Sequence, residues 1–342
     1  MIKCGCMTVT LRSFAKINLG LRIGAARNDG FHKLLTIYQT IGLHDIIKVN
    51  IERGTGIEIR CADPQVPKDG SNTCYRIVES AHRFLHARGR VIVEIEKRLP
   101  VQGGLGGASA NAVAALLGFE RALKKFLSAE DRLRIAAEVG SDLPLFLVGG
   151  TVLGVGRGEQ VYPMEDLPAI ACVVVTPEVG VSTPKAFAEW DRLTCEKLMC
   201  WNKSDSGSSE KLTVANASDR MVELSRAYSA WLSVPYSGAP LSVDSRRSRA
   251  ENPLLALVRA GIMNDFEHVV FPEYPELCEV KRALERAGAK YASLSGSGSA
   301  LYGLFGSRGD AARAAARLRK QGWAAEATVT LTRRQYWKKI FV

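Results

Sequence analysis

The stretch that decides the fold runs Pro100-Val101-Gln102-Gly103-Gly104-Leu105-Gly106-Gly107-Ala108-Ser109-Ala110-Asn111-Ala112. It follows a β-branched run over 91–95 and leads into a small and apolar run over 112–117, which predicts a strand, a glycine-rich loop and a buried helix. Small residues let backbone N–H groups approach a ligand, and a helix N-terminus favours an anion. The stretch lacks the GxxxxGK[ST] pattern, which excludes a standard P-loop, and a loop needed only for tight packing stays an alternative.

Upstream, the segment 14–23 alternates strictly between apolar and other side chains. Lys16, Asn18 and Arg22 fall on one face, so we expect a strand with one buried face and one polar face. A lone lysine on such a strand is commonly solvated.

Downstream, periodicity predicts further elements on both sides of the stretch. A helix is expected over 72–87, and Pro275 opens another one. Strands are expected over 170–175 and 300–305. The second half therefore predicts β and α elements in a two-layer sandwich.

Composition excludes several classes of protein. The chain has 342 residues, of which 46% are hydrophobic and 24% charged, as in globular proteins of about two domains. No window approaches the roughly 20 apolar residues of a membrane span, and the first residues lack a signal-peptide core. The eight cysteines form no CxxC pair, which favours reduced thiols in a cytoplasmic protein. The net charge of +11 suits nucleic acid, an anionic membrane surface or an anionic small molecule.

Two further features could carry chemistry. Asp142 follows Gly140 and precedes an apolar segment, where a helix cap or turn is the plain alternative. A second glycine loop covers 295–299 before a strand, where a hairpin or bulge is the plain alternative. Two glycine loops in one chain favour a pocket that handles phosphate.

These motifs together resemble the GHMP small-molecule kinases, most closely the 4-diphosphocytidyl-2-C-methyl-D-erythritol kinases. The matching segments occur in the family's order and span nearly the whole chain outside 195–250: Phe14-Ala15-Lys16-Ile17-Asn18-Leu19, Asp29-Gly30-Phe31-His32, the stretch 99–112, Gly140-Ser141-Asp142-Leu143-Pro144, Gly156-Arg157-Gly158-Glu159, Val181-Ser182-Thr183-Pro184-Lys185-Ala186-Phe187, Asn264-Asp265-Phe266-Glu267 and Leu294-Ser295-Gly296-Ser297-Gly298.

The resemblance implies an α+β fold in two domains. The N-terminal ATP-binding domain, expected over 1–162, would be like domain 2 of ribosomal protein S5. The GHMP kinase C-terminal domain, an α/β sandwich, would cover 163–342 and carry a flexible insertion at 195–250, whose polar runs fit a solvated surface segment.

The resemblance also implies the site. Asp142 would act as the base, and Lys16 would lie beside it as the second catalytic residue. ATP would bind to eleven residues of the first glycine loop: Pro100, Val101, Gln102, Gly103, Gly104, Leu105, Gly106, Gly107, Ala108, Ser109 and Ala110. The substrate would be bound by Asn18, Phe31, His32, Thr183 and Phe187, with its cytosine ring between the two phenylalanines. Mg²⁺ would accompany ATP. Ser109 is a candidate to contact the phosphates or Mg²⁺, and the sequence assigns no metal ligands beyond that.

Three positions depart from the family pattern. Ala108 and Ala110 stand where the family has glycine and serine, so altered nucleotide affinity is expected rather than lost activity. Phe31 replaces the common tyrosine, which keeps stacking but removes a hydroxyl.

The implied activity is ATP-dependent phosphorylation of the 2-hydroxyl of 4-diphosphocytidyl-2-C-methyl-D-erythritol in the non-mevalonate isoprenoid pathway. The alternatives are a GHMP kinase for homoserine, mevalonate or a sugar, and a catalytically silent nucleic-acid-binding protein. A cytoplasmic monomer or weak homodimer, with no nucleic-acid or membrane partner, is expected. The positive charge would then attract two phosphorylated substrates.

Overall fold

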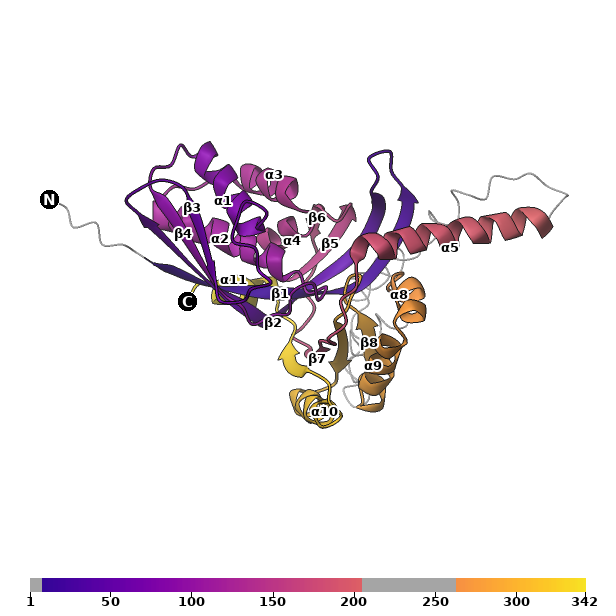
Figure 1. Ribbon diagram of the computed structural model, residues 1–342. Coiled ribbons are helices and arrows are strands. Elements are labelled where there is room, and N and C mark those ends of the chain that lie inside the picture. Colours follow the sequence, from indigo (N-terminus) through magenta and orange to yellow (C-terminus); the bar gives the residue numbers. More distant parts are fainter. Residues whose placement is uncertain (1–7, 205–262) are drawn as a thin grey trace, which may run out of the picture. The chain divides into compact units, whose positions relative to one another are not determined.

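The structure is a computed structural model that describes residues 8–204 and 263–342 (Figure 1). It contains two compact units, each assembled from separate segments of the chain. The first unit comprises 1–17, 38–169 and 329–342, and the second comprises 18–37 and 170–328. The boundary expected at 162/163 stays a prediction about the family's domains, because these units divide the chain at other places.

Two long strands, β1 (Val9–Ala26) and β2 (His32–Glu52), pass from one unit into the other. They belong to a six-stranded sheet ordered β3-β4-β2-β5-β6, in which β1 pairs with β2. The other members are β3 (Ile57–Cys61), β4 (Arg90–Glu96), β5 (Thr151–Gly156) and β6 (Gln160–Pro163). β4 lies antiparallel to β2 and parallel to β3.

The helices of the first unit are α1 (Thr73–Phe84), α2 (Gly107–Leu123), α3 (Ala129–Val139), α4 (Leu143–Val148) and α11 (Arg333–Ile340). Figure 1 shows α1 to α4 grouped together. Every residue of α2 from Ala110 to Glu120 is buried, since the helix packs against β2 at Gly118 and also against α1. A Cβ on Gly118 would lie 2.7 Å from the Val49 side chain. The expected order of strand, glycine-rich loop and buried helix is confirmed.

The second unit contains a four-stranded sheet ordered β10-β7-β9-β8. Its strands are β7 (Ala171–Val175), β8 (Tyr291–Leu294), β9 (Leu301–Phe305) and β10 (Ala325–Val329). The helices of this unit are α5 (Thr183–Ser204), α8 (Glu267–Glu273), α9 (Pro275–Arg286) and α10 (Arg308–Lys320). Residues of α8, α9 and α10 share one apolar core with alternate residues of β7, which makes the sandwich that the sequence predicts.

The polar face expected on the first strand is buried, so the prediction of a half-buried strand is wrong. Lys16, Asn18 and Arg22 are each at most 6% exposed. Burial is tolerated because each of these side chains has an internal partner. The Arg22 guanidinium, for example, donates to the Asp265 carboxylate over 2.8 Å.

Residues 205–250 of the expected insertion lie outside the described residues, and 195–204 continue helix α5. None of the described helices combines the length and the apolarity needed to cross a bilayer.

Candidate active site

The first glycine loop joins β4 to α2 and requires left-handed backbone at several positions. Gly104 has φ +72°, Gly106 has φ +68°, and Gln102 adopts +58°. Residues 107–110 form the first turn of α2. Gly106 is the N-cap of this helix without a side-chain cap, and the first turn carries no acidic residue. The loop therefore presents a helix N-terminus that suits a phosphate.

The loop lies directly against Lys16. The backbone N–H of Lys16 donates to the Leu105 carbonyl over 3.0 Å. A Cβ on Gly106 would lie 3.0 Å from Lys16 Cγ and 3.0 Å from Phe146 Cζ. Glycine at 106 thus satisfies both a left-handed backbone and a close approach.

A buried carboxylate, Asp45, ties the two ends of the loop together. Its Oδ1 accepts the backbone N–H groups of Arg98 and Leu99, each over 2.7 Å. Its Oδ2 accepts Lys97 Nζ over 2.8 Å and Asn111 Nδ2 over 2.9 Å. Because Asp45 is fully buried, these charge-assisted bonds hold the residues before the loop to the helix that follows it.

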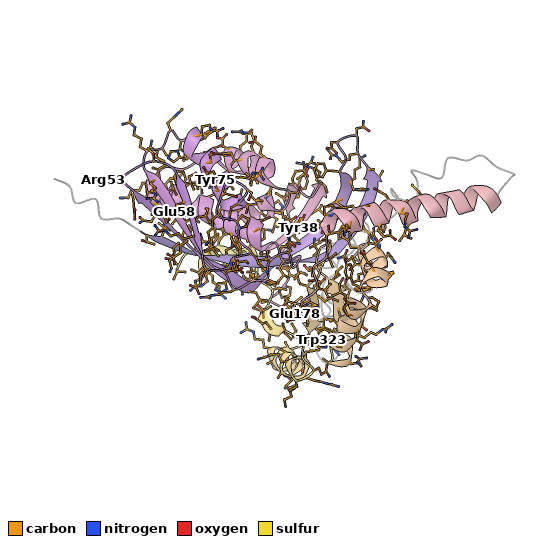
Figure 2. All side chains as sticks on the ribbon, viewed as in Figure 1. Tyr38, Arg53, Glu58, Tyr75, Glu178 and Trp323 are labelled. Atoms are coloured by element: carbon orange, nitrogen blue, oxygen red, sulfur yellow. The ribbon has the colours of Figure 1, made fainter. Side chains whose placement is uncertain are left out.

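The two expected catalytic side chains come together. Lys16 Nζ lies 3.5 Å from Asp142 Oδ2, and Tyr38, labelled in Figure 2, donates its hydroxyl to Asp142 Oδ1 over 3.0 Å. The Lys16 ammonium also lies 5.7 Å from the centroid of the Tyr38 ring. The Lys16 side chain is 4% exposed and that of Asp142 is 33% exposed, so the carboxylate is the member of the pair that solvent and ligands reach.

Burial dominates the electrostatics of this cluster. Desolvation lowers the pKa of Lys16, and the neighbouring Asp142 only partly offsets that effect. Burial, reinforced by Asp142, raises the pKa of Tyr38 well above its usual value. The tyrosine hydroxyl therefore keeps its proton and remains a donor at physiological pH.

Asp142 immediately precedes α4, yet its side chain makes no capping hydrogen bond to that helix. Its two carboxylate oxygens face Tyr38 and Lys16 instead. Asp142 thus occupies the turn and the N-cap position that the plain alternative expects, but its side chain does not cap the helix.

A second group of expected site residues lies in the second unit. The rings of His32 and Phe187 stack with centroids 4.8 Å apart and planes 9° apart. Asp191 of α5 lies 2.7 Å from His32 Nε2, and Phe187 packs edge-on against Phe266. The remaining aromatic residue, Phe31, is 49% exposed. It is thus His32 that stacks on Phe187 in this structure.

The other expected substrate residues are held by internal hydrogen bonds within the same unit. Asn18 Nδ2 donates to Thr36 Oγ1 over 2.8 Å. The hydroxyls of Thr183 and Ser297 lie 2.7 Å apart, which joins the start of α5 to the second glycine loop. Asn264 donates to the carbonyl of Leu294, at the end of β8, and to that of Gly296 in the loop, so side chains help to hold the loop in place.

Comparison with known proteins identifies the family. Residues 72–150 match the family described as GHMP kinases N terminal domain, and residues 250–323 match GHMP kinases C terminal. The chain is 37% identical to the 4-diphosphocytidyl-2-C-methyl-D-erythritol kinase of Solibacter usitatus over 298 residues, which cover 87% of this chain and 81% of the relative. The chain belongs to the 4-diphosphocytidyl-2-C-methyl-D-erythritol kinase family. The Synechococcus member of this family is 34% identical over 94% of this chain and 93% of its own length.

Solved structures agree with this family. A crystal structure of 4-(cytidine 5'-diphospho)-2C-methyl-D-erythritol kinase aligns with a TM-score of 0.69 and 25% identity, covering 94% of this chain and 98% of that one. A homoserine kinase from Cytophaga hutchinsonii aligns with a TM-score of 0.64 and 18% identity over 95% of each chain, which shows a shared fold alone. The two-domain α+β fold of a GHMP kinase and membership of an enzyme class are thereby confirmed.

Sequence reasoning missed Tyr38, Asp45 and Asp191. Tyr38 looks like a core aromatic, and nothing in its sequence neighbours indicates a carboxylate partner 104 residues away. Asp45 interrupts an apolar segment between Leu43 and Ile46, and a buried acid of this kind is the one available signal.

Proposed function

We propose that this chain transfers the γ-phosphoryl group of ATP to the 2-hydroxyl of 4-diphosphocytidyl-2-C-methyl-D-erythritol, in the non-mevalonate route to isoprenoid precursors. The observation that carries the proposal is the pairing of Lys16 with Asp142 beside the glycine loop, in a chain of this kinase family.

The chemistry follows from the cluster. Asp142 takes the proton of the substrate hydroxyl as its oxygen attacks the γ-phosphorus. The new O–P bond forms while the bond between the γ-phosphorus and its bridging oxygen breaks, and ADP leaves with that electron pair. The Lys16 ammonium pairs with the carboxylate and stabilises the negative charge on the attacking oxygen. Its low exposure strengthens both effects, because little water screens it.

ATP fits the first glycine loop. Gly104 and Gly106 supply the left-handed turns of the loop, and the uncapped start of α2 offers N–H groups to phosphate oxygens. The loop contacts named from the sequence, residues 100–110, belong to this proposal.

Mg²⁺ bound to ATP would neutralise charge on the phosphates during transfer. Among the described residues no group of three or more His, Cys, Asp or Glu side chains is arranged to hold a metal ion. In this proposal the ion arrives bound to the nucleotide, and Ser109 is the loop residue that would contact it.

For the second substrate, the aromatic group supports recognition of a pyrimidine. His32 would hydrogen-bond the base, and Phe187 and Phe31 would offer faces for stacking. Phe187 stacks on His32 in this structure. A cytosine ring that takes the place of His32 on this face of Phe187 requires Phe187 and His32 to separate. Asn18 and Thr183 would contact the rest of the substrate.

A GHMP kinase for another alcohol is the competing function, since homoserine and mevalonate kinases share the fold. The test is an ADP-release assay with the cytidyl substrate, homoserine and mevalonate in parallel. Turnover of the cytidyl substrate is expected. Turnover of only homoserine or mevalonate would remove the specific assignment, and RNA binding without any turnover would favour the silent alternative.

The base is tested by Asp142→Asn, which should lower kcat by about 10²–10⁴. Asp63→Asn is the matched control, because Asp63 lies in the same unit and only accepts a turn N–H from Gln65. Near-normal kcat in Asp142→Asn would contradict the role of this carboxylate.

A further inference from the structure

Residues from two other segments of the chain lie close to one oxygen of Asp142. Tyr38 of β2 donates its hydroxyl to Oδ1 over 3.0 Å. Gly158, in the turn between β5 and β6, packs so tightly there that a Cβ would lie 2.4 Å from the Tyr38 hydroxyl oxygen and 4.0 Å from Asp142 Oδ1. Gly158 has φ +102°, which is unusual for any residue with a side chain. The turn thus leaves room for one hydroxyl and little else.

The hydroxyl of Tyr38 serves as a permanent donor. The residue is 2% exposed, and burial raises its pKa well above the usual value, so it keeps its proton at physiological pH. The charged groups around the cluster are Lys16 on β1 and Glu159 in the same turn as Gly158, where Arg157 lies 3.6 Å from Glu159. The negative charge of Glu159 disfavours a tyrosinate further.

The two oxygens of Asp142 consequently have different partners. Oδ1 accepts from the uncharged Tyr38, and Oδ2 lies 3.5 Å from the Lys16 ammonium. Two fixed partners on opposite oxygens define the rotation of the carboxylate about its Cβ–Cγ bond. The part that is still exposed, a third of the side chain, then faces in one defined direction.

We propose that Tyr38 is the positioning residue of the reaction: by donating to Oδ1 it fixes the plane of the Asp142 carboxylate. This inference rests on the proposed role of Asp142 as the base. Tyr38 acts through Asp142 rather than on the substrate, so its loss should affect kcat and the pH dependence of kcat while leaving KM for ATP unchanged.

The direction of the pH effect follows from the hydrogen bond. A donor to a carboxylate favours the ionised form, so removing it makes the base hold its proton to higher pH. In Tyr38→Phe the acidic limb of the kcat profile should move to higher pH. At the pH optimum, kcat should fall about tenfold, because the Asp142 carboxylate loses a hydrogen bond. Water reaches the exposed third of the Asp142 side chain and limits the loss.

The experiment compares kcat from pH 5 to 9 in the parent enzyme, Tyr38→Phe and the control Tyr336→Phe. Tyr336 is equally buried and also loses one hydroxyl, which donates to the Phe146 carbonyl over 2.7 Å. Thermal unfolding is measured alongside. A shifted limb in Tyr38→Phe alone supports the proposal, whereas an unshifted limb, or an equal shift in Tyr336→Phe, overturns it. Lack of turnover by the parent enzyme would refute the proposed function instead.

A second variant, Gly158→Ala, moves the hydroxyl without deleting it. Its Cβ displaces the Tyr38 hydroxyl oxygen, so the same limb should shift in the same direction. Combined with Tyr38→Phe, where no hydroxyl stands in the way, Gly158→Ala should change kcat by less than twofold further. Full additivity of the two changes would show that the turn does not act through the hydroxyl and would overturn the proposal. If Tyr38→Phe fails to fold, Gly158→Ala alone decides, and an unshifted limb in that variant would overturn the proposal.

Discussion

The contact between the glycine loop and Lys16 makes Gly106→Ala an informative perturbation. The new methyl group would meet Lys16 Cγ at 3.0 Å, Lys16 Cε at 3.2 Å and Phe146 Cζ at 3.0 Å. It would also occupy a backbone with φ +68° and ψ +19°. The substitution therefore adds backbone strain and presses directly on the stem that carries the ammonium group.

Two contributions set the magnitude. Left-handed backbone costs an alanine about 1–2 kcal/mol. Contacts of 3.0 Å require Lys16 and Phe146 to shift, and overpacking of this kind costs about 1–3 kcal/mol. The smaller entropy of the unfolded chain offsets about 0.4–1 kcal/mol. The free energy of unfolding should fall by about 2–4 kcal/mol, and kcat should fall at least tenfold because the ammonium moves away from Asp142.

Urea unfolding and steady-state ADP release measure the two effects. The matched control is Gly56→Ala, in the same unit, because Gly56 also has positive φ (+94°) but nothing within 4 Å of its Cβ position. After the same offset from the entropy of the unfolded chain, the control should lose about 0–1.6 kcal/mol from strain and keep its kcat. A Gly106→Ala enzyme with the stability of the control and kcat within twofold of the parent would refute the inferred contact between loop and lysine.

Three further outcomes are expected. Lys16→Met should lower kcat by about 10²–10³. The free energy of unfolding should stay unchanged or rise by up to about 2 kcal/mol, because a buried charge is removed, and a loss of stability in urea titration would contradict this. Because burial lowers the pKa of Lys16, kcat should begin to fall on the alkaline side below pH 10.5. The free energy of unfolding should instead rise with pH between the pKa of Lys16 in the folded protein and its pKa in the unfolded chain, because the unfolded chain binds the extra proton there. Profiles of kcat and of stability against pH check these opposite signs. Asp265→Asn removes the charge that pairs with the buried Arg22, and the free energy of unfolding should drop by about 3–5 kcal/mol, with no such drop for an exposed aspartate.

Local pattern predicts a large part of this fold. The helix over 72–87 is observed as α1, with Asn72 as its N-cap. By contrast, β2 continues to Glu52 from His32, and its middle was not foreseen, because 35–41 is buried on both faces and shows no alternation. Helix α11 was also missed, although Thr332 and Gln335 form a capping box that marks its start.

The residues of the candidate site were likewise predictable only in part. Lys16, Asp142 and the glycine loop were found because a known family carries them as short motifs. Tyr38 and Asp45 were not, because their importance lies in partners far along the chain: Tyr38 with Asp142, and Asp45 with Asn111. Sequence pattern predicts where helices and strands form, and only the tertiary structure shows which distant side chains meet.

The division of β1 between Ile17 and Asn18, and of β2 between Ile37 and Tyr38, has a consequence for dissecting this enzyme. A cut at 162/163 gives an N-terminal fragment that carries 18–37, which belong to the second unit, and that lacks 329–342 of its own. Neither fragment is a complete unit, so they should be poorly soluble when expressed singly and should regain activity only by co-expression. Gene fusions and truncations of this kinase are therefore best placed at the chain ends, because an internal junction between halves breaks both units at once.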